Sequence, residues 1–282
     1  MRRLVDRIFR LATGACAIGA CLLIAGIVVT LIVLAWPALD MTLLTTSSPA
    51  GFGSAGIGYQ VVGTLLLVST ALLVSAPLAV ALALAQSVYL GPRAARALSL
   101  GLYTANAVPS IVLGIVGLIV FAKLLGWGKS WLAGGVILGL MILPTLTVSL
   151  VTRIKALPRR YLDSAAGLGL NRSQIVRSVV LPQARGGLVV GGLLGIARAA
   201  GETAPIMFTA VVFAGATLPR GVRDSPILAL PYHIFVLAQD SYNPQTNAFM
   251  WSAALVLLTL VFLASLVALP ARLKSTEEAR HG

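Results

Sequence analysis

The sequence predicts an all-α integral membrane protein with six transmembrane helices in a single domain, residues 1–282. Of its 282 residues, 58% are hydrophobic and only 10% are charged, and the mean hydropathy is +0.96. A soluble domain of this length cannot bury so much apolar surface, so lipid must be the solvent. Helices are expected because backbone groups in lipid must be satisfied within each segment. The predicted spans cover about 12–36, 60–86, 99–123, 131–152, 184–214 and 248–270.

Positive charge orients these spans. With the N-terminus inside, 16 of the 21 Lys and Arg residues fall in cytoplasmic pieces and four fall in the outer loops. Because cytoplasmic loops carry an excess of Lys and Arg, both termini and the loop 153–183 are predicted to be cytoplasmic. This placement accounts for the net charge of +13 without nucleic acid as a partner. The apolar run 11–36 is too long for a signal-peptide core, so the first span is expected to stay uncleaved.

A pair of charged residues stands near the middle of the fifth predicted span. Arg198 and Glu202 lie in the segment ARAAGETAPIMFTA, and Thr203 follows them. An ion at the bilayer centre costs about 3 to more than 10 kcal/mol, and intramembrane ions usually mark a solute pathway. Residues four apart share a helix face and can pair, so a purely structural ion pair is the alternative. We favour a translocation path lined by these three residues, because arginine offers an oxyanion a bidentate fork.

Small and polar residues extend this face along the fifth span. If the helix is continuous, one arc of about 80° holds a stripe of them. The stripe comprises Gly187, Gly191, Gly195, Arg198, Glu202, Pro205 and Thr209. Small residues at four-residue spacing allow another helix to approach closely, so Gly187, Gly191 and Gly195 are predicted to form a packing seam. In the third span, Asn106 and Ser110 share a face and are further candidates for the path.

No catalytic or metal-binding constellation is visible in the sequence. The only histidines are His233 and His281, which cannot form a metal cluster of their own. The tripeptide Gly128-Lys129-Ser130 resembles the end of a P-loop, but Lys123 occupies the position of the required first glycine. The chain is therefore predicted to be no enzyme and to bind no metal, nucleotide or other cofactor itself.

The loop between the fourth and fifth spans carries residues at defined spacing. It reads Asp163-Ser164-Ala165, three residues, Gly169, nine residues and Val179-Val180-Leu181-Pro182. This resembles the EAA loop of ABC-importer permeases, E-A-A-x3-G-x9-I-x-L-P, with conservative departures at the first two positions and at Val179. The resemblance implies a type I ABC importer permease-like bundle in which this loop docks on a cytoplasmic ATPase. The coupling residues would be Asp163, Ser164, Ala165, Gly169, Leu181 and Pro182, with the Leu-Pro pair ending the segment before the fifth span.

Further segments carry a narrower resemblance. GYQVVGTLLL (58–67), VPSIVLGI (108–115) and ARAAGETAPIMFTA (197–210) resemble the PstA-type permeases of the bacterial phosphate-specific importer. That resemblance implies a multi-pass protein of the bacterial inner (plasma) membrane that imports inorganic phosphate. It also implies three partners: a PstC-type permease subunit, a dimeric cytoplasmic ATPase that uses the ATP, and a periplasmic phosphate-binding protein.

Three alternatives differ in what the chain would have to show. A permease for another oxyanion, such as sulfate or molybdate, is disfavoured by the RAxGET element at 198–203. A secondary transporter would show internal inverted repeats and several intramembrane ions. A membrane-embedded enzyme would need a catalytic cluster at a membrane face. The sequence shows neither of the latter two patterns.

Overall fold

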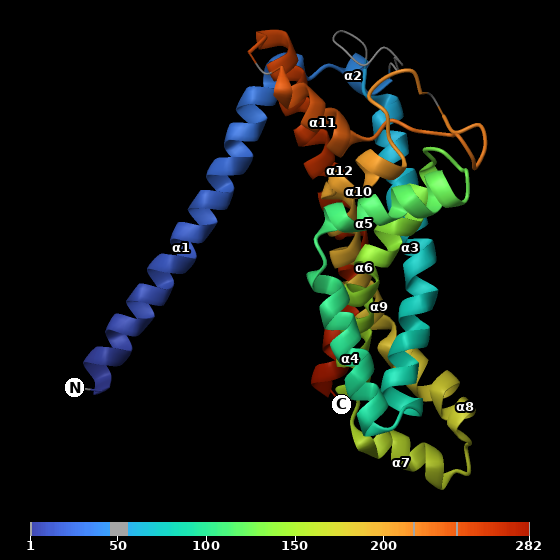
Figure 1. Ribbon diagram of the computed structural model, residues 1–282. Coiled ribbons are helices and arrows are strands. Elements are labelled where there is room, and N and C mark those ends of the chain that lie inside the picture. Colours follow the sequence, from blue (N-terminus) through green and yellow to red (C-terminus); the bar gives the residue numbers. More distant parts are fainter. Residues whose placement is uncertain (1, 46–55, 217, 241, 282) are drawn as a thin grey trace.

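The chain folds almost entirely into helices that run lengthwise beside one another (Figure 1). The computed structural model describes residues 2–45, 56–216, 218–240 and 242–281. Its α-helices are α1 Arg2–Ala35, α2 Met41–Thr45, α3 Gly58–Leu84, α4 Pro92–Ala107, α5 Ser110–Gly117, α6 Trp131–Lys155, α7 Arg159–Gly167, α8 Arg172–Ile175, α9 Leu181–Gly201, α10 Ala204–Thr209, α11 Leu230–Gln239 and α12 Pro244–His281. Four shorter turns are the 3-10 turn η1 Trp36–Ala38 and the π-helical turns η2 Ala85–Tyr89, η3 Leu118–Leu124 and η4 Val176–Val180.

The helices account for the six predicted spans by length and composition. Five segments are long and apolar enough to cross a membrane, namely Phe9–Ala38, Gly58–Tyr89, Trp131–Lys155, Arg172–Gly201 and Pro244–Leu266. A sixth crossing is present if the bent pair Pro92–Ala107 and Ser110–Leu124 is counted as one broken span. The all-α membrane fold is therefore confirmed, although two of the spans differ from the prediction.

The third predicted span, 99–123, is not one helix. α4 ends at Ala107, α5 begins at Ser110, and the two axes differ by 91°. Val108 has an extended backbone, with φ −65° and ψ 127°, as expected for a residue that precedes proline. Pro109 then supplies the N-cap of α5. The prediction of a continuous helix was wrong because hydropathy alone does not register this restriction on the backbone.

The fifth predicted span, 184–214, is also interrupted. α9 ends at Gly201, Glu202 has an extended backbone with φ −82° and ψ 127°, and the short α10 follows. Pro205 lies in the first turn of α10, where its missing N–H removes no hydrogen bond. The predicted stripe therefore belongs to two helices, with Pro205 and Thr209 on α10. The region 215–247, expected from sequence to be a loop, contains α11.

α6 lies at the centre of the bundle and packs against both α3 and α9. On the α9 side, a Cβ at Gly187 would lie 2.8 Å from the Cβ of Arg153. A Cβ at Gly195 would lie 2.8 Å from Cδ1 of Leu146. On the α3 side, a Cβ at Gly139 would lie 3.0 Å from the carbonyl oxygen of Ala71. Glycines thus allow both helices to approach α6 closely, which is how helices associate in lipid.

α1 diverges from the rest of the bundle (Figure 1). Its apolar side chains are exposed along most of its length, and Ala35 at its end is buried. The carbonyl of Ala35 accepts a hydrogen bond of 3.0 Å from the Ser252 hydroxyl of α12. The first span is therefore attached at one end, and lipid or another subunit has to cover its apolar sides.

The glycines of α9 give a matched pair of substitutions. A Cβ at Gly191 would lie 3.0 Å from the Cβ of Ser149 and 3.1 Å from Cα of Leu146, whereas a Cβ at the neighbouring Gly192 meets nothing within 4 Å. We expect Gly191→Leu to destabilise the protein by about 1–3 kcal/mol through overpacking, and Gly192→Leu to have little effect. Thermal unfolding of the two detergent-solubilised variants measures the difference. Equal melting temperatures would contradict the close approach of α9 to α6.

His233 of α11 is a buried ionisable group outside the six candidate spans. It is 8% exposed, and its ring stacks on Phe213 with centroids 5.5 Å apart. Its Nδ1 has no hydrogen-bond partner among the described residues. Burial lowers the pKa of His233 from its ordinary value of 6.5 to about 4.

This depressed pKa predicts that stability falls on acidification. The unfolded chain takes up the proton near pH 6.5, whereas the folded chain resists it until about pH 4. Unfolding is therefore favoured as the pH falls through that window, by about 3 kcal/mol once it is complete. We expect the melting temperature of the wild type to drop between pH 7 and pH 4 more steeply than that of His233→Gln. Parallel pH profiles for the two proteins would show that His233 makes no such contribution.

Candidate functional site

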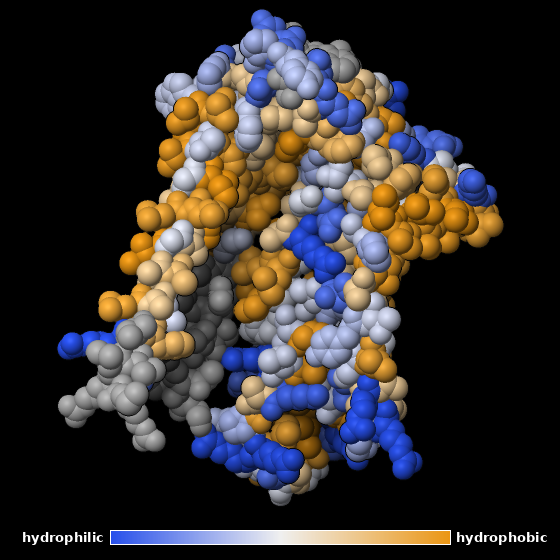
Figure 2. All heavy atoms as spheres, turned by 60° about the vertical axis from the view of Figure 1, so that its left-hand side comes forward, coloured by the Kyte–Doolittle hydropathy of each residue, from blue (hydrophilic) through white to orange (hydrophobic). Residues whose placement is uncertain are grey.

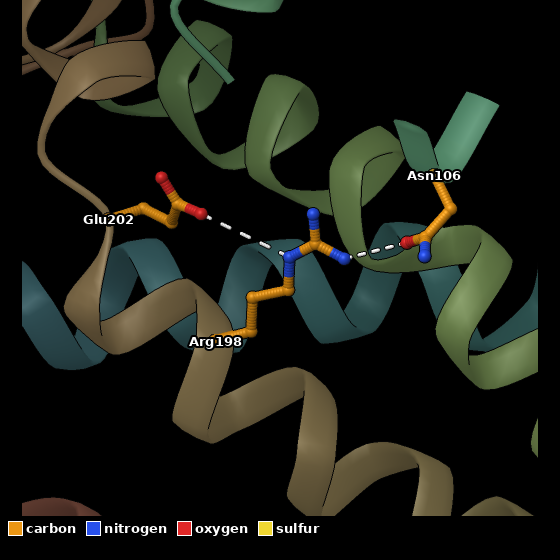
Figure 3. Close-up of polar contacts among 3 residues, drawn as sticks. All are labelled: Asn106, Arg198 and Glu202. Carbon is orange, nitrogen blue, oxygen red and sulfur yellow. Dashed lines mark hydrogen bonds and ion pairs between the residues drawn. The ribbon is translucent and has the colours of Figure 1, made fainter. Parts of the chain in front are cut away.

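Arg198 lies in the last turn of α9 and connects two elements that are far apart in the sequence (Figure 3). Its Nη1 donates a hydrogen bond of 2.7 Å to Oδ1 of Asn106, near the end of α4. Its Nε lies 4.0 Å from Oε1 of Glu202. The side chains of Arg198 and Glu202 are 32% and 21% exposed, so both are partly accessible from outside the chain. The predicted pairing of these two residues is present. Arg198 lies within α9, however, and Glu202 lies just beyond the end of the helix, so the pair does not lie on one face of a continuous helix.

The guanidinium keeps most of its hydrogen-bonding capacity. An arginine has five N–H donors. In the part of the chain that the structure describes, Arg198 donates one hydrogen bond, to Asn106, while its distance to Glu202 is at the limit of an ion pair. The amide group of Asn106 faces the arginine with its oxygen (Figure 3). The remaining N–H groups can therefore bind an oxyanion without breaking the contact that holds the side chain.

Two helix breaks lie side by side around Arg198. One separates α4 from α5, and the other separates α9 from α10 at Glu202 and Thr203. Beyond the breaks, α5 and α10 also touch, since a Cβ at Gly114 would lie 2.8 Å from Cα of Pro205. In membrane proteins, interrupted helices occur where the backbone is buried in protein or lines a water-filled cavity. The sequence signal that marks both breaks is a proline, Pro109 at the first and Pro205 at the second.

The other predicted path residues lie at these breaks without contacting the arginine. Ser110 is the first residue of α5, and Thr203 is the N-cap of α10. Among the described contacts, neither side chain bonds to Arg198, Glu202 or Asn106. The structure therefore brings three of the five predicted path residues together and places the other two at the adjoining helix starts.

The surface of the bundle carries polar side chains in separate places. Figure 2 shows hydrophilic side chains at mid-height on a face that is otherwise largely apolar, and more of them at the lower end of the bundle. In Figure 1 that lower end carries α7 and α8. Polar side chains therefore occur within the apolar part of the bundle as well as at its two ends.

The loop between α6 and α9 projects from this end (Figure 1). α7 and α8 are joined by a turn in which Gly169 has φ +76°, a left-handed conformation that favours glycine. Asn171 is the N-cap of α8 and forms a capping box with Gln174. The side chain of Asn171 accepts a hydrogen bond of 3.0 Å from the backbone N–H of Gln174, and the side chain of Gln174 accepts one of 2.8 Å from the backbone N–H of Asn171. The left-handed glycine in the turn and the capping box at the start of α8 together fix the shape of this loop.

The predicted coupling residues occupy different environments in the loop. Asp163 and Ser164 of α7 are exposed, whereas Ala165 is 5% exposed and packs inside this chain. A Cβ at Gly169 would meet open space. The exposed residues can contact a partner, while Ala165 holds α7 against the bundle.

Leu181 and Pro182 do not end the loop segment, contrary to the prediction. They begin α9, which continues without interruption from α8 and η4 as the single span Arg172–Gly201. A proline inside a helix lacks the N–H donor and clashes with the carbonyl four residues earlier. The π-helical turn Val176–Val180 directly before Leu181 widens the helix at this point, which lets the run continue.

Comparison with solved structures shows the same fold. A chain of the MetNI methionine ABC transporter, solved in inward-facing conformations, superposes with a TM-score of 0.59 at 16% sequence identity. The match covers 78% of this chain and 94% of that chain. At this identity the likeness concerns the arrangement of the helices alone.

Sequence comparison finds relatives with named roles. "Probable phosphate transport system permease protein PstA" of Methanocaldococcus jannaschii is 30% identical, covering 97% of this chain and 95% of that protein. "Phosphate transport system permease protein PstA" of Haemophilus influenzae is 27% identical, covering 84% of this chain and 83% of that protein. For "Phosphate transport system permease protein PstA 2" of Mycobacterium bovis, the identity is 34%, but the match spans about half of that relative, 52%. Residues 75–269 match the family described as "Binding-protein-dependent transport system inner membrane component", and the chain belongs to this family.

Proposed function

We propose that this chain is a permease subunit of an ATP-driven phosphate importer. It forms half of the path for the solute and couples that path to a cytoplasmic ATPase through α7, α8 and the turn between them. The observation that carries the proposal is Arg198, held by Asn106 and Glu202 at the meeting point of two helix breaks. The family and the names of its phosphate-transport relatives support phosphate as the solute.

The chemistry of the site suits transient binding of inorganic phosphate. The free N–H groups of Arg198 are donors for phosphate oxygens, and a bidentate geometry is available to a guanidinium. Glu202 lies 4.0 Å from the guanidinium and repels an anion bound there. The arginine therefore attracts the solute while the glutamate limits how long it stays. Ser110 and Thr203, at the starts of α5 and α10, supply hydroxyls to the same path.

The partners follow from the same proposal. A PstC-type permease subunit supplies the other half of the path, and a periplasmic phosphate-binding protein delivers the solute. A dimeric cytoplasmic ATPase hydrolyses the ATP, while this chain holds no nucleotide and catalyses no reaction of its own. Both termini and the α7–α8 loop face the cytoplasm of a bacterial inner (plasma) membrane, as the bias of positive charge indicates. Asp163 and Ser164 contact the ATPase from the exposed side of α7.

Substrate uptake tests the proposal and the role of Arg198 together. In proteoliposomes that hold this chain with its co-purifying partners and the binding protein, radiolabelled phosphate uptake is expected to require ATP. Arg198→Ala is expected to reduce the uptake about tenfold or more, because a charge-assisted hydrogen bond contributes about 1.5–3 kcal/mol. Arg198→Lys, which keeps the charge without the planar fork, is expected to retain part of the activity.

The controls separate the site from assembly and from substrate identity. Arg223→Ala removes an exposed arginine outside the path and is expected to transport normally. Gel filtration of each complex shows whether the subunits still assemble. Normal uptake by Arg198→Ala would contradict the path, and ATP-driven uptake of another oxyanion in place of phosphate would overturn the substrate. Uptake by this chain alone without ATP would overturn the importer itself.

Coupling through the α7–α8 turn gives a second prediction. Asparagine tolerates the left-handed conformation of Gly169, whereas tryptophan strains it and adds bulk at the exposed turn. We expect Gly169→Trp to weaken ATPase association and ATP-driven uptake at least severalfold, and Gly169→Asn to retain most of both. Co-purification of the ATPase and its stimulated hydrolysis rate are the measurements. If Gly169→Trp associates and transports as the wild type does, the turn does not dock on the ATPase.

A further inference from the structure

A cavity of about 450 Å³ lies at the end of the bundle that carries α7 and α8. Its walls come from four parts of the chain: the π-turn η2, the end of α6, α7, and the run from α8 into η4. Arg198 is 18 residues further along the continuous helix than Val180, the last wall residue on that helix, a distance of about 27 Å at 1.5 Å per residue. The cavity is therefore separate from the proposed path.

The cavity is lined by positive charge without a balancing acid. Lys155 from α6, Arg159 from α7 and Arg172 from α8 all line it, and its described lining contains no Asp or Glu. Within the described residues, none of the three cations forms an ion pair. Three like charges converging on one space repel each other, so a negatively charged occupant is stabilised there.

A second observation points to an occupant that accepts hydrogen bonds. The hydroxyl of Ser87, in η2, is buried and has no hydrogen-bond partner among the described residues, although Ser87 lines this cavity. A buried hydroxyl without a partner is unfavourable, and rotation of the Ser87 side chain toward the cavity would let an oxygen of a bound anion satisfy it. The rest of the wall is apolar and includes Ile154 and Ile175. The cavity can therefore hold an oxyanion together with carbon attached to it.

We propose that this cavity binds a phosphoryl oxyanion, supplied either by the headgroup of an anionic phospholipid or by free phosphate. Arginine matches the geometry of phosphate oxygens, and basic pockets between transmembrane helices bind anionic headgroups. The bound anion would connect the end of α6 to α7 and α8 through Lys155, Arg159 and Arg172. It thereby fixes the position of the α7–α8 loop relative to the bundle. This site lies beyond the proposed transport function and outside the proposed path.

Two double variants with the same change in charge test the site. Arg159→Gln with Arg172→Gln removes two lining cations, whereas Arg160→Gln with Arg177→Gln removes two cations that do not line the cavity. All four residues are exposed, so the two variants differ in the cavity and not in exposure. Ser87→Leu fills the cavity without any change in charge, which provides a second test if the first variant assembles poorly. All proteins are full-length, purified with the subunits that remain bound, and checked by gel filtration.

Two measurements distinguish the sources of the anion. Native mass spectrometry counts phosphatidylglycerol and, as the neutral comparison, phosphatidylcholine retained by each protein. Equilibrium dialysis with radiolabelled orthophosphate in zwitterionic detergent, on an Arg198→Ala background and without the binding protein, measures free phosphate away from the path. We expect one of the two anions to bind about tenfold or more weakly to Arg159→Gln/Arg172→Gln and to Ser87→Leu than to Arg160→Gln/Arg177→Gln.

Each outcome bears directly on the proposal. Selective loss of phosphatidylglycerol assigns the site to a lipid headgroup, and selective loss of orthophosphate assigns it to the free ion. If both double variants lose an anion equally, the binding reflects general surface charge and the proposal is wrong. Unchanged retention of both anions by Arg159→Gln/Arg172→Gln and Ser87→Leu would overturn it as well.

Discussion

The close approach of α3 and α9 to α6 is the constraint on which the rest of the structure depends. Lipid is as apolar as the helix surfaces, so helices associate in it by packing, and small residues permit the tightest contact. A Cβ at Gly135 would lie 2.5 Å from Cγ2 of Thr70, and one at Gly195 would lie 2.8 Å from Cδ1 of Leu146. The contacts of the α9 glycines fix the rotation of α9 about its axis, and that rotation places Arg198 toward α4.

The polar site depends on the breaks as much as on this packing. A charge within a span is costly unless partners surround it, and Asn106 and Glu202 are the partners of Arg198. Asn106 lies one residue before α4 ends, and Glu202 lies directly after α9 ends. On a straight α9, Glu202 would share a face with Arg198 as well, because residues four apart do. The polar site therefore lies where both helices are interrupted.

Much of the fold could be predicted from the sequence, because six apolar runs of sufficient length leave few other arrangements. The breaks could not, since the mean hydropathy of a span registers nothing of the backbone restriction that Pro109 places on Val108. The pairing of Arg198 with Glu202 was expected from their spacing, although an extended residue brings them together. The contact with Asn106 spans 92 positions and follows from the packing of the helices, which no local pattern contains.

α9 connects the α7–α8 loop to the polar site at Arg198. The span from Arg172 to Gly201 is one helical run of 30 residues, with the α7–α8 loop at its start and Arg198 in its last turn. A helix of this kind transmits a displacement of the loop along its length, since its hydrogen bonds resist stretching. Motion imposed at the loop would therefore alter the distances from Arg198 to Asn106 and Glu202, and with them the number of N–H groups open to an anion.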